Sequence, residues 1–186
     1  LNTGMEDYSQ AVTVQVSDGI PLKVEYLDRQ SVLVVYDRFA AIYNVSDGTE
    51  KARYGFGANQ LQSAAVSGKN TVLLFGDGEH TELTRFVVLD TNLAAVGQAA
   101  VPVRANSVAA SRSGVYVLTN TLVYCYGLDG SDNGSVDPGA KPLAVIDADR
   151  LLLLTQEQIL DLDAPQTDAS ASAVSSEAVS QPASAS

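Results

Sequence analysis

Tryptophan is absent from this chain of 186 residues, and cysteine and histidine occur only once each. One cysteine rules out an internal disulfide and a zinc site built from several cysteines. One histidine rules out a metal site that needs two histidines from this chain. No run of 18 or more apolar residues occurs, so no segment is predicted to span a bilayer as a helix. These absences limit the chemistry that the chain can carry by itself.

Basic residues are also scarce: 11 Lys and Arg stand against 22 Asp and Glu, for a formal net charge of −11. This acidic balance opposes contacts with phosphate groups, so the sequence predicts no nucleic-acid partner. Hydrophobic residues nevertheless make up 46% of the chain, which is enough to fill the core of one domain. The chain begins at Leu1 rather than at methionine, and we expect a processed product or an excerpt of a longer protein.

The segment 164–186 consists mainly of Ser and Ala, with Val174 and Val179 as its only larger apolar side chains. Such a segment cannot bury enough surface to offset the entropy of ordering it, so we predict a disordered tail. The alternative is a spacer or a glycan-bearing stalk, which would imply an exported protein.

Residues 1–163 contain a repeat. Four short apolar runs begin at positions 32, 72, 115 and 151, so their starts are 40, 43 and 36 residues apart. Each run is followed by a polar turn and then by a second apolar run. Runs this short, bounded by turn residues, are typical of buried strands. The paired runs are 32–35 and 41–45, 72–75 and 86–89, 115–118 and 122–126, and 151–154 and 159–162.

Each second run ends near an aspartate, which we predict to have a structural role. An aspartate at this position can accept a hydrogen bond from the backbone N–H two residues further on, and so close the turn after the strand. We expect this of Asp47, Asp90, Asp129 and Asp163.

Weaker strands are predicted on both sides of each pair. Before the first runs lie 22–26, 63–66, 107–110 and 143–146, in which small residues would suit a strand at a crowded central axis; these are Ser63, Ala65, Ser107 and Ala109. After the second runs, outer strands are expected at 50–55 and 93–101. The third unit offers only 131–139, which is rich in turn residues and a poor strand candidate.

Three or four antiparallel strands repeated about every 40 residues are typical of β-propeller blades. The sequence therefore predicts an all-β propeller of about four blades with three- to four-stranded sheets; a β-sandwich is the alternative. Larger rings are commoner than four-bladed ones, so we expect the C-terminal part of a larger ring. The alternating segment 11–16 is an extra strand that would close this ring or belong to a preceding blade. The predicted units are 19–57, 58–102, 103–140 and 141–163.

The repeat of apolar strand, turn and apolar strand ending in Leu-Asp resembles the repeats of pyrroloquinoline-quinone-type propellers, and its period is also WD40-like. The resemblance rests on Leu89–Asn92 and Leu128–Gly130. The tryptophan that usually ends those repeats is missing; Tyr54 would replace it in the first unit, and Val96 or Gly97 in the second. The chain is also similar to uncharacterised, membrane-anchored propeller proteins of Gram-positive bacteria with a Ser-rich end. The calcium ligands and paired cysteines of the quinone dehydrogenases have no counterpart here, so their activity is not implied.

Few groups are candidates for chemistry. Asp77, Glu79 and His80 lie together at a predicted hairpin tip, where a solvated histidine is expected. Cys125 lies on an apolar strand and is expected to be a buried, inert thiol. The stretch Asp129–Asp137 has oxygen ligands at the first, third and fifth positions of a calcium loop, but Ala140 replaces the bidentate glutamate, which favours a polar hairpin.

Two further residue types are informative. The motif Gly55-Phe56-Gly57 is too short to bind phosphate. Most tyrosines are expected in the core or between blades, with some on a propeller face, where tyrosine favours binding. The arginines, one or two per unit, suggest pairing at blade edges; they include Arg38, Arg53, Arg85, Arg104 and Arg112.

We therefore predict a non-catalytic β-propeller module of an extracytoplasmic, cell-envelope protein that binds a protein or glycan partner on a propeller face. We assign it no catalytic, metal-binding or cofactor-binding residue and no cofactor. An alternative is a fragment of a quinone- or metal-dependent enzyme whose active residues lie elsewhere. A third possibility is a structural chain that completes its ring by dimerising through open blade edges.

Overall fold

The computed structural model describes residues 13–14, 18–77, 80–81 and 84–162. These residues form fifteen β-strands and no α-helix, arranged in three four-stranded sheets and one three-stranded sheet. Every sheet is an antiparallel meander in which strands adjacent in sequence are paired. No described helix is long and apolar enough to cross a membrane.

The four sheets follow one another along the chain, and we number them as blades 1 to 4. Blade 1 contains β1 (Pro21–Tyr26), β2 (Ser31–Tyr36), β3 (Phe39–Asn44) and β4 (Glu50–Gly55). Blade 2 contains β5 (Leu61–Ser67), β6 (Asn70–Phe75), β7 (Arg85–Leu89) and β8 (Ala95–Ala100). Blade 3 contains β9 (Ser107–Ala110), β10 (Gly114–Leu118), β11 (Val123–Gly127) and β12 (Asp132–Val136). Blade 4 contains β13 (Pro142–Asp147), β14 (Leu151–Thr155) and β15 (Ile159–Asp161).

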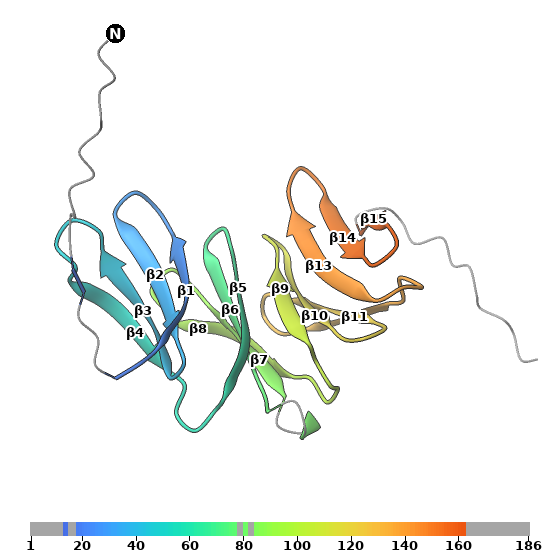
Figure 1. The fold of residues 1–186 in the computed structure, drawn as a ribbon, viewed down its shortest axis with the longest axis horizontal. Helices are drawn as coiled ribbons and strands as arrows, with labels where there is room; N and C mark the ends of the chain where they lie inside the picture. Colours follow the sequence, from blue (N-terminus) through green and yellow to red (C-terminus); the bar gives the residue numbers. More distant parts are fainter. Residues whose placement is uncertain (1–12, 15–17, 78–79, 82–83, 163–186) are drawn as a thin grey trace, which may run out of the picture.

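The blades lie side by side in an open arc, with blades 1 and 4 at its two ends (Figure 1). The first strands of all four blades, β1, β5, β9 and β13, together line one pocket of about 270 Å³. Small residues on β5 and β9 let these strands approach, and the backbone N–H of Val108 donates a hydrogen bond to the Ser63 Oγ 3.2 Å away. This arrangement confirms the predicted blades and the role of the small residues at the axis. The β-sandwich alternative is wrong, because the sheets form a series rather than two opposed layers.

Three apolar cores hold the blades together. Leu33 and Val35 of blade 1 pack with Leu73 of blade 2, and Val72 and Leu74 on its opposite side pack with blade 3. Between blades 3 and 4 the core contains Tyr116, Leu118, Val123, Leu151 and Leu153. Because alternate side chains of each central strand point to opposite neighbours, a central strand is apolar along its whole length. This explains why the four strongest runs of the sequence do not alternate with polar residues.

The predicted aspartate turns are present wherever the structure describes them. The Oδ1 atoms of Asp47, Asp90 and Asp129 accept backbone hydrogen bonds from residues 49, 92 and 131 at 2.9, 2.8 and 3.0 Å, respectively. Hydrogen bonds from Thr49 lower the pKa of Asp47, and those from Ser131 lower the pKa of Asp129. Asp163 and the segment 164–186 lie outside the described residues.

Two predicted strands, 131–139 and 11–16, differ from the others. The stretch 131–139 was the weakest candidate, yet Asp132–Val136 forms β12, because an outermost strand needs only backbone pairing with β11 and little apolar surface. Of the predicted strand 11–16, the structure describes only Thr13 and Val14, neither of which lies in a strand. The other four residues of that segment lie outside the described residues.

Candidate binding surfaces

The single histidine lies where a solvated hairpin tip was predicted, in the loop between β6 and β7. Its backbone N–H donates to the Asp77 Oδ1 over 2.8 Å, and its Nδ1 lies 2.6 Å from the Asp77 Oδ2. The side chain of His80 is 58% exposed. Glu79, the third member of this group, lies outside the described residues. The described pair is therefore an exposed local contact.

Cys125 lies half-buried on β11, with its Sγ 3.9 Å from the carbonyl oxygen of Val123. Burial, and to a smaller extent the charge of Asp132, raise the pKa of this thiol. A thiol with a raised pKa carries little thiolate at neutral pH and is a poor nucleophile. This agrees with the predicted inert packing role.

The calcium-like stretch Asp129–Asp137 comprises the turn between β11 and β12, the strand β12 itself, and the first residue after it. The Ser131 hydroxyl donates to the Asp129 Oδ1, while Asp132 and Asp137 each accept a backbone N–H two residues further on. Each carboxylate thus closes its own turn. Among the described residues, no group of three His, Cys, Asp or Glu is placed to hold a metal ion. The geometry agrees with the polar-hairpin interpretation.

The glycine motif and the tryptophan replacements have packing roles. Phe56 is 2% exposed and packs edge-on against Phe75, with ring centroids 5.2 Å apart, in the core between blades 1 and 2. Tyr54 packs against the same core. At Gly97 a Cβ atom would lie 2.0 Å from the carbonyl oxygen of Leu128, so the backbones of blades 2 and 3 approach where a side chain cannot fit.

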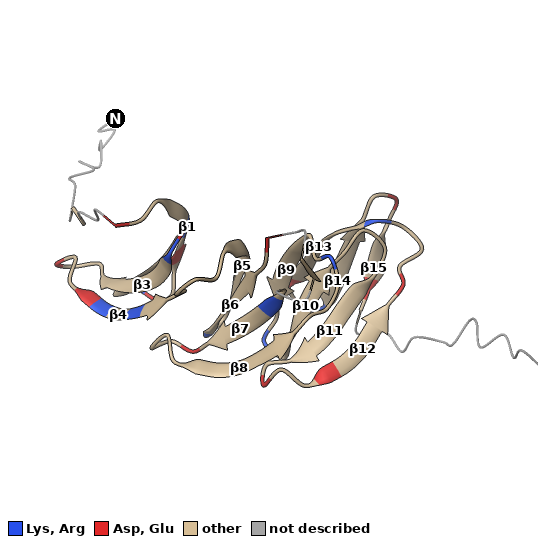
Figure 2. Ribbon diagram, turned by 90° about the horizontal axis from the view of Figure 1, so that it is seen from below, with Lys and Arg blue, Asp and Glu red and all other residues tan. Residues whose placement is uncertain are grey.

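The tyrosines and arginines also lie largely as the sequence suggested. Tyr36, Tyr43, Tyr116 and Tyr126 are buried in apolar clusters, whereas Tyr26 is 71% exposed. The arginines are spread over the blades rather than gathered in a basic patch, and those on β4 and β7 lie far apart (Figure 2). Ion pairs within one blade join Arg38 to Asp37, Arg53 to Glu50 and Arg150 to Asp161.

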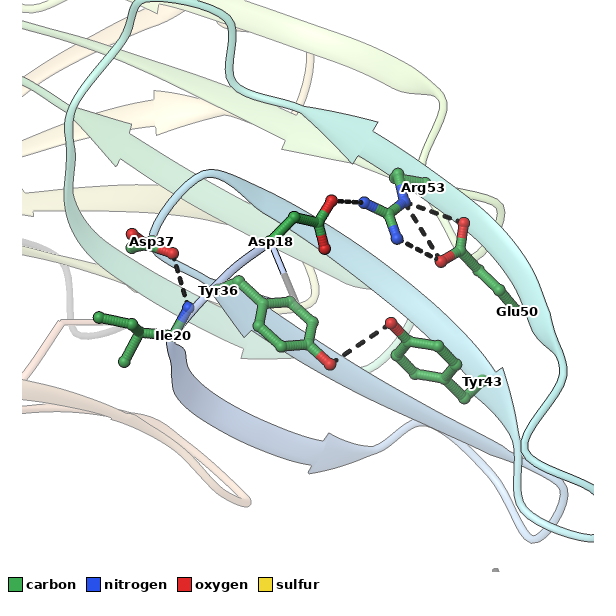
Figure 3. Close-up of polar contacts among 7 residues, drawn as sticks. All are labelled: Asp18, Ile20, Tyr36, Asp37, Tyr43, Glu50 and Arg53. Atoms are coloured by element: carbon green, nitrogen blue, oxygen red, sulfur yellow. Dashed lines mark hydrogen bonds and ion pairs between the residues drawn. The ribbon is translucent and has the colours of Figure 1, made fainter. Parts of the chain in front are cut away.

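The outer face of blade 1, which points away from blade 2, carries a cluster of aromatic rings. Tyr36 and Phe39 stack with ring centroids 4.3 Å apart. The Tyr36 hydroxyl donates to that of Tyr43 over 3.3 Å (Figure 3). Burial, followed by the hydrogen bond with Tyr36, raises the pKa of Tyr43. A Cβ atom on Gly19 would lie only 2.8 Å from the Phe39 ring, so the segment 18–20 packs directly on this cluster.

Polar contacts hold the segment 18–20 in place. The Arg53 guanidinium lies 3.9 Å from the centroid of the Phe39 ring. It donates to Asp18 over 3.1 Å and to Glu50 over 2.7 Å (Figure 3). The hydrogen bond to Glu50 raises the pKa of Arg53, and that to Asp18 raises it further. The backbone N–H of Ile20 donates to the Asp37 Oδ1 over 2.8 Å. Chain entry into blade 1 is therefore fixed by these contacts.

Both ends of the arc also expose apolar side chains, and we call these surfaces the end faces. On blade 1, Val24 and Tyr26 lie opposite Val34 and Val32 on the face pointing away from blade 2, and are 59% and 71% exposed. On blade 4, Ile146 and Ile159 lie opposite Leu152 and Leu154 on the face pointing away from blade 3 and are 45% and 62% exposed. Apolar surface of this kind on a sheet face is typical of an interface.

A pocket of about 480 Å³, which we call the rim pocket, lies where the connection from blade 1 to blade 2 meets blade 2. This connection runs along the lower rim of the arc in Figure 1. The connection between β4 and β5 supplies Ala58, Asn59 and Gln60, and the facing ends of β6 and β7, with the start of their loop, supply Phe75, Gly76, Asp77 and Arg85. Phe75 and Arg85 are directly opposite across the two strands, so their side chains lie on one side of the sheet. No local sequence pattern indicates this pocket, because three separate segments form it.

One buried acceptor lies near Gly76, on the side of blade 2 that faces blade 3. The Gln62 Nε2 donates to the carbonyl oxygen of Ala105 over 2.5 Å, while its Oε1 is buried and accepts no hydrogen bond from any described residue. That oxygen lies 3.0 Å from the position of a Cβ on Gly76. An unsatisfied buried acceptor costs about 1–3 kcal/mol.

No protein-family model and no curated protein sequence matches this chain. Solved structures do match. BamB from Moraxella catarrhalis is 17% identical, with a TM-score of 0.56 over 80% of this chain and 48% of that one. The Pan2 WD40 domain of Neurospora crassa is 13% identical, with a TM-score of 0.52 over 76% and 48% of the two chains. The chain is a partial β-propeller.

A third similar structure is BBS1N, solved in complex with ARL6DN, which is 13% identical and has a TM-score of 0.52 over 74% of this chain and 48% of that chain. At these identities the likeness concerns the fold alone. The chain spans about half the length of each of these three solved structures.

Proposed function

We propose that this chain is a non-catalytic β-propeller module that binds a protein partner. Support comes from the structural roles of the residues that could otherwise carry out catalysis, namely the turn aspartates, His80 and Cys125. The aspartates of the hairpins close turns, His80 contacts Asp77 in an exposed loop, and the Cys125 thiol has a raised pKa. A propeller of similar fold, BBS1N, has been solved in complex with another protein.

We further propose that the four blades belong to a larger ring, and the end faces carry this proposal. Each described blade interface buries one apolar face of each blade against the next. The outer faces of blades 1 and 4 both carry apolar side chains, with Val24 and Ile159 more than half exposed. Further blades packed on these faces would bury them in the same way.

The quinoprotein-like family and an extracytoplasmic, envelope-associated location are part of the same proposal. The low cysteine content, the net charge of −11 and the Ser/Ala-rich end of the sequence support this location. The proposal includes the resemblance, drawn from the sequence alone, to membrane-anchored propellers of Gram-positive bacteria. Fractionation of cells that express the natural protein checks the location: recovery with the envelope is expected, and recovery in the cytosol would contradict it.

The binding function is tested on purified full-length protein. Its absorbance spectrum and metal content are expected to show no retained quinone and no stoichiometric metal ion. Crosslinking through a photoreactive residue at exposed Gln60 is expected to yield a discrete protein adduct whose partner then binds saturably in a purified assay. A retained cofactor would favour the enzyme alternative, and failure of every crosslinked protein to bind saturably would contradict the proposal.

A further inference from the structure

The rim pocket contains an unusual arginine. Arg85 is half-buried, whereas every other arginine of the chain is exposed. Its guanidinium lies 5.9 Å from the centroid of the Phe75 ring and has no hydrogen bond or ion pair with any described residue. Arg38, Arg53 and Arg150, by contrast, each contact a carboxylate of their own blade.

This arrangement favours an external anion. Partial burial removes water from a guanidinium, and the loss is offset only when its N–H groups find acceptors. The ring of Phe75 and the pairing of β6 with β7 fix the direction of the Arg85 side chain, so it is already oriented for a ligand. The pocket of about 480 Å³ is large enough for a side chain or a sugar unit.

The other lining groups select the kind of anion. Asp77 lies in the same pocket and the whole chain carries a net charge of −11, so a doubly charged group such as a phosphate monoester is repelled more strongly than a singly charged one. Asn59 and Gln60 place neutral amide-bearing residues at the opposite wall, which suits the polar groups beside a carboxylate in a peptide or a sugar.

We infer that this pocket binds a carboxylate of the partner, with Arg85 as the residue that receives it. A planar carboxylate can accept two parallel hydrogen bonds from a guanidinium, which gives both affinity and direction. Because the proposed partner is a protein, we assign this group to an Asp or Glu side chain. A uronic acid of a glycan presents the same anion and serves as the contrasting probe in the test. This inference rests on the proposed binding function and names the chemistry of the ligand.

The test measures binding of two probes to the full-length protein. One is a fluorescent peptide rich in Asp and Glu, with an amide-containing Asn/Gln peptide as its neutral counterpart. The other is a labelled oligogalacturonate, with the neutral galactose oligomer beside it. The matched variants are Arg85→Gln and Arg38→Gln, because Arg38 lies on the same rim and carries the same charge, but its side chain is 79% exposed.

We expect the acidic peptide to bind saturably, its neutral counterpart to bind at least tenfold more weakly, and Arg85→Gln to lose about 10- to 100-fold in affinity for the acidic peptide. Arg38→Gln should change affinity less than about twofold. Binding of the oligogalacturonate alone would contradict a protein side chain as the ligand. Absence of binding by both acidic probes, or equal losses in the two variants, would overturn the inference. If a protein partner binds but is insensitive to Arg85→Gln, this site is wrong while the binding function stands.

Discussion

Blades 1 and 4 each have one sheet face that no described blade covers, and the two faces differ in how their apolar side chains are buried. On blade 1, the face that points away from blade 2 carries Tyr36, Phe39 and Tyr43, which are only 5%, 4% and 3% exposed, and the segment 18–20 packs on this cluster. On blade 4, Ile146 and Ile159 remain 45% and 62% exposed on the face that points away from blade 3. A short segment of chain with three polar contacts can therefore cover part of a blade, whereas a bare blade face needs a neighbour.

The contrast also separates two kinds of interaction. Apolar contacts between blades scale with buried area and supply most of the stability. The contacts of Asp18, Arg53 and Glu50 are exposed to solvent and define where the chain lies rather than how stable it is. Four pairs of substitutions, in order of decreasing effect, test this separation.

The largest effect is expected where blade 4 packs on blade 3. Leu153 is fully buried there, whereas its neighbour Leu152 is half-buried on the end face. Leu153→Ala should destabilise the protein by about 2–5 kcal/mol, and Leu152→Ala by less than about 1.5 kcal/mol. Urea unfolding, followed by circular dichroism, measures both. Equal losses would show that the end face is as well packed as the interior and would contradict the comparison.

The next effect concerns the close approach of blades 2 and 3. A methyl group on Gly97 would meet the backbone of Leu128 and Asp129, whereas at Gly55, also on an outermost strand, it would meet nothing within 4 Å. Gly97→Ala should therefore cost about 1–3 kcal/mol through displacement of the turn, while Gly55→Ala should be neutral or slightly stabilising. Thermal unfolding of the two variants tests this, and a neutral Gly97→Ala would refute the close approach.

Much of this fold is predictable from the sequence because it is local. The central strands are short apolar runs between turns, and the aspartates that end them accept hydrogen bonds only two residues away, as at Asp47 and Asp129. The 40-residue spacing then indicates blades. Strand β12 is harder to predict from the sequence, because its backbone pairing with β11 needs no apolar pattern.

The candidate pocket is not predictable in this way. Arg85 lies 26 residues after Asn59 in the sequence, and nothing local to either residue shows that blade packing brings them to one pocket. The ion pairs of Arg53 with Asp18 and Glu50, which we call the clasp, are equally hard to predict. Asp18 and Arg53 are 35 residues apart in the sequence, and their contact depends on the path of the chain over Phe39. The end faces can be predicted in part. The alternation of Leu22, Val24 and Tyr26 predicts an apolar face, but only the arrangement of the four blades shows that no described blade covers it.

A smaller effect is expected from the clasp on blade 1. Arg53→Met keeps the apolar stem over Phe39 and removes the ion pairs with Asp18 and Glu50, so it should cost about 0.5–1 kcal/mol. Arg150→Met on blade 4 removes a single pair from a side chain that is 73% exposed and should cost less than about 0.3 kcal/mol. Denaturant midpoints at low and high salt measure both. Identical losses would mean that the clasp contributes no more than an ordinary surface pair.

The smallest effect is a pH dependence of the turns. The lowered folded-state pKa values of Asp47 in blade 1 and Asp129 in blade 3 mean that these carboxylates stabilise the fold when ionised. Their contribution is fully present above the unfolded-state pKa of about 3.9 and is lost as pH falls through the lower folded-state values. Asn can accept the same hydrogen bond but does not titrate in this range, so Asp47→Asn and Asp129→Asn should flatten the loss of stability between about pH 4 and pH 2. Unfolding free energies measured across that range test this, and an acid limb unchanged in both variants would show that other carboxylates control it.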